Sequence, residues 1–140
     1  MINMLKQLLA LCLSIVLFSA CSDNTTADDW VGTYSGTLTF TEVMVSDGSV
    51  FTDSGVETLV IAKGSSDDQV LFSLEGGIGQ ALTIDGNKLD ISNSMGSDYT
   101  DGEGFLTLDG DVITLEWSGT YLMDGNPYSE DTYDGTFTRQ

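Results

Sequence analysis

The sequence predicts an all-β domain, most simply an antiparallel up-and-down β-barrel of about eight to ten strands, with a β-sandwich as the alternative. Three observations predict this fold class. Short segments alternate apolar and polar residues, and Gly-containing turns separate these segments at regular spacing. An aromatic-x-Gly-Thr-aromatic pattern at residues 30–34 returns at 117–121 and at 133–137, as expected of a sheet whose first and last strands meet.

The first twenty residues have the features of an export leader. Lys6 precedes an apolar run at 8–18 that only Ser14 interrupts, and this run is too short to span a membrane as a mature helix. Residues 17–21, Leu-Phe-Ser-Ala-Cys, resemble the lipobox of bacterial lipoproteins. That resemblance implies that Cys21 is lipidated, with palmitate-type chains, and becomes the first mature residue. An ordinary secretory signal with a chance cysteine is the alternative.

Residues 21–29 are polar, contain three Asp, and read as a lipidated acidic tether ahead of a single domain at 30–140. By resemblance to lipoprotein sorting, Ser22 after the cysteine implies transport to the outer membrane. The acidic start also resembles the surface-export tags of Bacteroidota lipoproteins. We therefore expect a cell-envelope protein held by its anchor on the periplasmic face or the cell surface.

The strands follow from period-two alternation. At residues 30–40 the even positions carry aromatic residues, Leu and Gly, while the odd positions are mostly β-branched. A weak strand at 50–52 is expected between turns at 47–48 and 53–55, and 92–104 is expected to be a loop. Further strands are predicted at 56–63, 70–75, 82–84, 89–91, 104–108 and 112–121, with a final strand that contains residues 133–137.

The opening segment also resembles a family signature. Trp30-Val31-Gly32-Thr33-Tyr34 is similar to the first strand of the calycins (lipocalins and fatty-acid-binding proteins), and the Gly-Thr-Tyr start and Gly-Thr-Phe end resemble lipocalin-like domains of Bacteroidota lipoproteins. Tyr34 stands where lipocalins usually carry tryptophan, and Arg139 is the basic residue near the last strand that could pack over it. The resemblance implies a calycin-like barrel with an interior that can hold a ligand.

Composition excludes several kinds of chemistry. The chain has no His, its two Cys lie at or before residue 21, and four Lys and Arg stand against 22 Asp and Glu, a net charge of −18. Ser-His-Asp or Cys-His catalysis, the usual zinc sites and nucleic-acid binding are therefore not expected. Most acids lie in Gly-containing turns, where Asp is favoured for backbone reasons. With so little site chemistry available, we expect no enzyme and no cofactor. The acidic segments at 98–103 and 109–111 supply oxygen ligands but lack EF-hand spacing, so we expect solvated loops without a metal, and carbohydrate recognition through Ca²⁺ loops is a further alternative.

The aromatic residues remain as candidates for function. On faces expected to point inward they either form a packed core or line a cavity for one small ligand. In the second case we expect Tyr34, Phe72, Trp117 and Tyr121 to line the cavity and Trp30 to plug the barrel end. The predicted function is non-catalytic binding of a small apolar or amphipathic ligand. The alternative is a structural or protein-interaction module with a packed core, whose Thr-rich face or acidic loops contact a partner.

Overall fold

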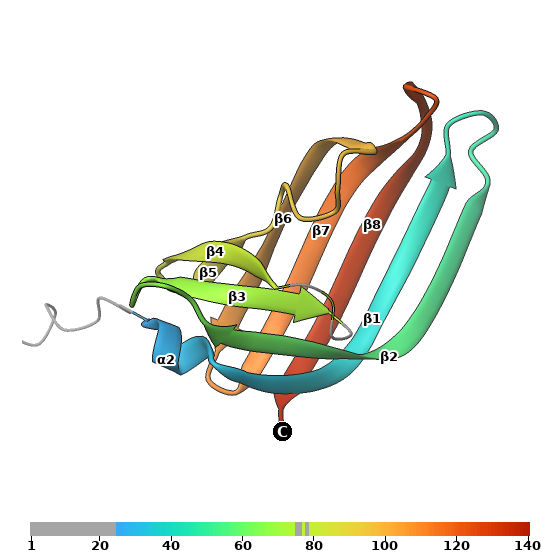
Figure 1. The fold of residues 1–140 in the computed structure, drawn as a ribbon. Helices are drawn as coiled ribbons and strands as arrows, with labels where there is room; N and C mark the ends of the chain where they lie inside the picture. Colours follow the sequence, from blue (N-terminus) through green and yellow to red (C-terminus); the bar gives the residue numbers. More distant parts are fainter. Residues whose placement is uncertain (1–24, 75–76, 78) are drawn as a thin grey trace, which may run out of the picture.

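The computed structural model describes residues 25–74, 77 and 79–140 and shows a closed antiparallel barrel of eight strands in sequence order. Each strand pairs with the next, and β8 (Asn126–Arg139) pairs with β1 (Gly32–Met44), which completes an up-and-down meander (Figure 1). The predicted all-β barrel is confirmed, and the sandwich alternative is wrong. The architecture is compatible with the calycin-like domain expected from the first and last strands.

The strands differ greatly in length. β3 (Gln69–Leu74), β4 (Gln80–Asp85) and β5 (Lys88–Asp90) are short, whereas β2 (Val50–Lys63), β6 (Tyr99–Asp109) and β7 (Val112–Met123), like β1 and β8, have 11 to 14 residues. The barrel therefore closes only at one end. Beyond β3–β5 the long strands continue as a curved sheet in the order β2-β1-β8-β7-β6 (Figure 1). We call these two parts the closed half and the open half.

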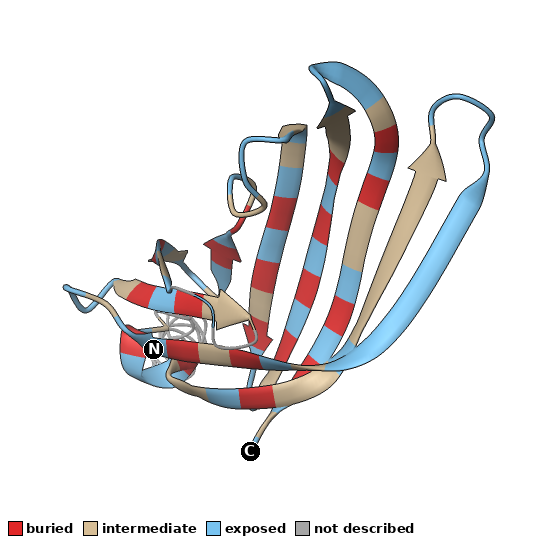
Figure 2. Cartoon of the chain, turned by 45° about the vertical axis from the view of Figure 1, so that its right-hand side comes forward, coloured by how far each residue is buried: buried red, intermediate tan, exposed pale blue. Residues whose placement is uncertain are grey.

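The division between the halves is visible in the pairing of β2. Its register with β3 covers only Leu59 to Lys63, while its register with β1 continues to Val50. Residues 50–56 are exposed, and they form the pale stretch of β2 in Figure 2. The sequence prediction of a turn at 53–55 is wrong, because twelve residue pairs with β1 keep this segment in one continuous strand.

Tight turns connect the strands where the sequence predicts them. Gly86, Gly110 and Gly125 follow Asp residues and have φ values of 59°, 59° and 77°. Glycine reaches this left-handed region without steric cost, and such turns match the twist of antiparallel strands. The loop prediction at 92–104 is only partly right, since β6 already begins at Tyr99.

The interior of the closed half is filled by side chains. On β7, Ile113, Leu115 and Trp117 are buried and alternate with exposed residues, as the period-two pattern predicts (Figure 2). The core cluster draws on every strand and on the short helix at the N-terminal side, and all its buried members lie between Ala27 and Phe137. The domain therefore carries its own core within residues 27–137.

The chain before β1 is helical and packed on the barrel. The helix α2 (Ala27–Trp30) lies at the end of the closed half, with Ala27 and Trp30 almost completely buried (Figure 1). Trp30 thus belongs to a helix and not to the first strand, although it closes the barrel end as expected. The part of the expected tether that the structure describes, Thr25 to Asp29, also differs from the prediction, because it contacts the domain. Cys21 and the leader lie outside the described residues.

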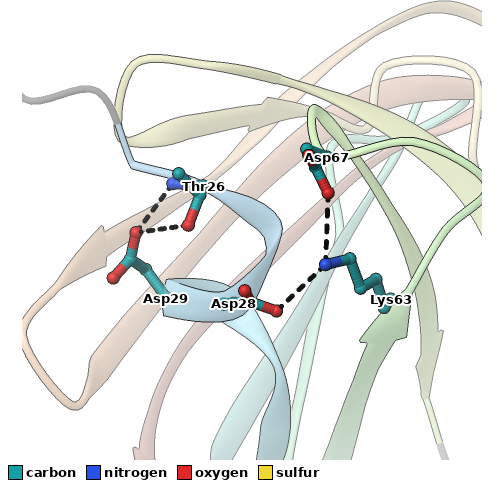
Figure 3. Close-up of polar contacts among 5 residues, drawn as sticks. All are labelled: Thr26, Asp28, Asp29, Lys63 and Asp67. Carbon is teal, nitrogen blue, oxygen red and sulfur yellow. Dashed lines mark hydrogen bonds and ion pairs between the residues drawn. The ribbon is translucent and has the colours of Figure 1, made fainter.

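Polar contacts fix α2 in place (Figure 3). The backbone N–H of Thr26 donates to Asp29 Oδ2 at 2.7 Å, and the Thr26 hydroxyl donates to the same oxygen at 3.0 Å. Lys63, at the end of β2, contacts Asp28 at 3.3 Å and Asp67 at 3.2 Å. The hydrogen bonds from Thr26 hold the pKa of the Asp29 carboxyl below its usual range.

Arg139 joins the last strand to the first. Its guanidinium lies 5.0 Å from the ring centroid of Tyr34, contacts Asp111 at 3.0 Å, and donates to the backbone carbonyls of Val31 and of Asp29 (2.5 Å for Asp29). Burial raises the pKa of Tyr34. Arg139 therefore packs over the Tyr34 ring, the position that the first-strand resemblance indicates for it.

Candidate functional site

The inner face of the open half carries a continuous series of aromatic rings. The strand registers place Phe40 opposite Tyr133 and Tyr133 opposite Trp117, and Tyr99 lies opposite Tyr121. Neighbouring ring centroids are 4.9 Å apart for Phe40–Tyr133, 5.8 Å for Trp117–Tyr133, 4.9 Å for Tyr99–Trp117 and 5.4 Å for Tyr99–Tyr121. These separations are favourable for aromatic pairs, so the rings form a connected surface across β1, β8, β7 and β6.

One end of this surface lies in a groove. The groove has a volume of about 300 Å³ and runs over β1, β2 and β8. Asp53 lies opposite Phe40 in the β1–β2 register. Glu57 lies opposite Gly36, four residues nearer to the closed half on the same strand and face. We call this the acidic aromatic groove and define it by six lining residues, which are Leu38, Phe40, Asp53, Gly55, Glu57 and Tyr133.

Glycines set the position of the largest ring. A Cβ atom at Gly119 would lie 2.5 Å from Cη2 of Trp117, and one at Gly102 would lie 3.0 Å from its Cζ2. The indole therefore lies flat against glycine backbone of β6 and β7. Trp117 is only 3 % exposed, and its Nε1 donates to the carbonyl of Ser92 at 3.3 Å. This ring supports the aromatic surface from below and presents little area to solvent.

A buried carboxylate lies on the same inner face of β8 as Tyr133. Asp131 is 3 % exposed; its Oδ2 accepts a hydrogen bond from the Tyr99 hydroxyl, and its Oδ1 accepts one from the Ser129 hydroxyl, both at 2.8 Å. Burial, together with the bond to Asp131, raises the pKa of Tyr99, so this phenol remains a hydrogen-bond donor at neutral pH. The donated bonds fix the orientation of the Tyr99 ring.

The four residues predicted to line a cavity are not brought together. Tyr34 is fully buried in the closed half, where its hydroxyl donates to the Trp30 carbonyl at 2.8 Å. Phe72 is also in the closed half and borders a separate hollow of about 220 Å³. Trp117 and Tyr121 both contact Tyr99 in the aromatic surface. The direct role of these four side chains in ligand binding stays a prediction.

The residues that define the groove were not selected from the sequence. The proximity of Phe40 and Tyr133 depends on the closure of β8 on β1, which places the two residues opposite each other. Asp53 lies in a segment that the sequence predicts to be a turn, whereas its pairing with β1 places it in a continuous strand. Alternation alone shows that Glu57 shares a face with Leu59 and Ile61, which was the available signal.

Other surface features of the described chain are weaker candidates for a ligand site. A hollow of about 540 Å³ lies at the end of the closed half and is lined by Asp28, Asp29, Asp111, Arg139 and neighbouring residues. Its arginine is already engaged by Asp111 and by backbone carbonyls. Within residues 25–74, 77 and 79–140, no three acidic, His or Cys side chains are grouped so as to hold a metal ion.

Comparison with known proteins gives the chain no family. No protein-family model matches it, and a search of the curated proteins finds no match. Among the residues that the structure describes, no helix has the length and apolar character needed to cross a bilayer.

Proposed function

We propose that this chain is a non-catalytic binding protein of the cell envelope that holds a small amphipathic ligand in the acidic aromatic groove. The observation that carries this proposal is the aromatic surface of the open half, which leads into a groove while the closed half is filled with side chains. Aromatic and apolar walls with a few convergent polar groups are typical of ligand sites.

The proposal moves the ligand from the barrel interior to the open half. The completely buried side chains of the closed half include Tyr34, Leu59, Leu106, Ile113 and Phe137. Close packing of this kind fills this part of the interior with side chains. By contrast, Phe40 and Tyr133 in the groove are half-buried and in contact with each other. A ligand on these rings would bury apolar area that the fold leaves partly exposed.

The location in the cell is part of the same proposal. A lipidated Cys21 would hold the protein on the outer membrane, since lipid chains at one residue provide stable anchoring when two or more are present. Cys21→Ser in the full chain is then expected to move the protein from the membrane fraction to the aqueous fraction. A Cys21→Ser protein that stays with the membrane would contradict the anchor without bearing on the groove.

Native mass spectrometry of residues 22–140, purified without detergent, tests the binding function. The domain carries its own core, so this fragment is expected to fold. A co-purifying mass that is lost on denaturation, or a mass acquired from a panel of amphiphiles, is the expected result. Phe40→Ala should weaken this binding. Phe105→Ala, which removes a 44 % exposed phenyl ring from β6 outside the groove, should not.

The interaction module remains as a second candidate, favoured by the filled closed half. Its contact surface would be the outer face of the sheet, where Thr37, Thr136 and Thr114 lie in one cross-strand row. A domain that acquires no mass from any amphiphile, and whose Phe40→Ala variant behaves as the parent, would favour this module over ligand binding.

A further inference from the structure

We propose that the open edge of β2 binds an extended basic peptide segment of a partner protein, which adds to the sheet of the open half as a further antiparallel strand. This inference goes beyond the proposed ligand binding and does not depend on it. It starts from the pairing of β2, because β3 covers only its stretch from Leu59 to Lys63. Among the residues that the structure describes, none pairs with residues 50–56 on the side away from β1. Figure 1 and Figure 2 show this stretch at the margin of the open half, and we call it the β2 edge.

The backbone of the β2 edge presents hydrogen-bonding groups to its open side. Directly after β2, the Gly64 N–H donates to the Gln69 carbonyl at the start of β3 at 2.8 Å. Backbone direction alternates along a strand, so the even-numbered residues of β2 direct their N–H and C=O groups away from β1. In the β2 edge these residues are Val50, Thr52, Ser54 and Val56. The Ser54 N–H donates to the Asp53 carboxylate at 2.9 Å. The other outward backbone groups offer a regular ladder to an added strand.

The other margin of the open half is protected against such pairing. On β6 the register with β7 shifts, and Asp101 within the shift has a φ of 53°. The backbone of Gly104 is already engaged, because its carbonyl accepts from the Ile91 N–H and its N–H donates to the Ser92 hydroxyl. By contrast, residues 50–56 pair with β1 without a shift and contain no Lys, Arg or Pro, which commonly protect edge strands. A regular, unprotected edge is suited to strand addition.

The side chains of the β2 edge define the chemistry of the added strand. On the outer face Val50 and Val56 are 64 % and 78 % exposed, so β-branched residues beside them would bury apolar area. On the inner face Phe51 is 56 % exposed, and Asp53 lies two residues further along. Lys or Arg beside this pair would meet an aromatic ring and an opposite charge.

Charge decides between a partner protein and a second copy of this chain. Strands β1 and β2 contain no Lys or Arg before Lys63, so they bring no positive charge to this margin. Two copies with a net charge of −18 each would repel one another. A basic segment would instead be attracted to the edge, and its main chain would then form the ladder. The occupant is therefore an extended segment in which basic and β-branched residues alternate.

A capped synthetic peptide of Lys-Val repeats, eight residues long, tests the inference with residues 22–140 of the protein. Calorimetry measures the affinity, and infrared spectroscopy of isotope-labelled peptide carbonyls reports whether the bound peptide becomes a strand. We expect binding together with a β-sheet amide I signal. A peptide of Glu-Val repeats has the same β-branched content and should bind at least about tenfold more weakly at low salt, because the acidic edge repels it.

Methylated peptides separate strand addition from plain charge attraction. In an antiparallel added strand whose Val side chains lie on the outer face, the Val N–H groups point toward β2 and the Lys N–H groups point away. Methylation of the Val nitrogens should therefore weaken binding by about tenfold or more, because ladder hydrogen bonds are lost. Methylation of the Lys nitrogens leaves the charge and the ladder intact and should change the affinity by less than about threefold.

Two substitutions at one position give the matched test on the protein. Thr52→Pro removes an N–H group from the open side of β2, and Thr52→Val keeps it. Both lose the contact between the Thr41 and Thr52 hydroxyls at 3.4 Å, and both keep the odd-numbered residues whose backbone faces β1. We expect Thr52→Pro to lose the Lys-Val peptide and Thr52→Val to bind it as the parent does. If Thr52→Pro unfolds in a thermal melt, the two methylated peptides still decide the question.

Each contrary result overturns the inference. Failure of the Lys-Val peptide to bind, or equal binding of the Glu-Val peptide, would rule out the basic partner. Equal effects of methylation on Val and on Lys would show attraction without strand addition. A protein that takes up no peptide but forms dimers, which Thr52→Pro abolishes, would assign the edge to a second copy. The amphiphile test of the groove is separate, because its variant Phe40→Ala lies on β1.

Discussion

Gly119→Ala tests the packing that supports the aromatic surface. The added Cβ would lie 2.5 Å from Cη2 and 2.9 Å from Cζ2 of Trp117, and 3.2 Å from Cα of Gly102. Carbon atoms in favourable contact are roughly 3.5–4.0 Å apart, so the indole must move by about 1 Å. It has little room, because Tyr99 packs edge-on against it at 4.9 Å and Tyr133 lies at 5.8 Å.

Overpacking of this kind costs about 1–3 kcal/mol. We expect Gly119→Ala to lower the free energy of unfolding by that amount, measured by urea denaturation, and to change the near-ultraviolet circular dichroism of the coupled rings. Gly55→Ala is the matched control on the same inner face, since its Cβ would meet only Glu57 Oε1, at 3.6 Å. If Gly119→Ala and Gly55→Ala are equally stable, Trp117 is not held against the glycines and the reasoning fails.

Three further predictions concern polar contacts. Arg139→Met loses two backbone carbonyl partners and should lower the free energy of unfolding, measured by urea denaturation, by about 1–3 kcal/mol. Lys88→Met should change it by no more than about 0.5 kcal/mol. Equal effects would refute the role of Arg139 in joining the last strand to the first. The pKa of Asp29 is lowered in the fold, so its contribution to the free energy of unfolding is present above its ordinary pKa of 3.8 and is lost as pH falls through the lower folded value. The difference in stability between the parent and Asp29→Asn should therefore narrow over that acid range. A constant difference would contradict the assignment. Tyr99→Phe removes one of two hydroxyl donors to the buried Asp131 and should destabilise by about 1–3 kcal/mol, with no change in melting counting against that bond.

The sequence was sufficient for the fold class because its signals are local. Asp-Gly turns at 85–86, 109–110 and 124–125 and the alternation on β7 are readable within a few residues, and all occur in the structure. The repeated aromatic-Gly-Thr-aromatic pattern also indicated correctly that the ends of the sheet meet.

Local signals failed where long-range pairing overrides them. Asp53-Ser54-Gly55 has turn composition, yet its pairing with β1 makes it strand. The first part of β6 was read as loop because it is polar, and its register shifts between Thr100 and Glu103, with Asp101 at a φ of 53°. The short helix has a local signal in the sequence, because Thr26 and, three residues later, Asp29 form a capping pair.

The groove could not be derived from the sequence for a different reason. Phe40 and Tyr133 are 93 positions apart, and their contact exists only because β8 pairs with β1 in one particular register. A shift of one residue would turn Tyr133 to the outer face. The unequal strand lengths, which leave the inner face of the long strands accessible, are likewise a property of the assembled sheet.

The position of α2 has a consequence for how the protein would stand on a membrane. The described chain begins at Thr25, beside α2 and at the opposite end of the barrel from the tips of the long strands (Figure 1). With an anchor at Cys21, the closed half would face the lipid. The open half would then lie on the side of the barrel away from the bilayer.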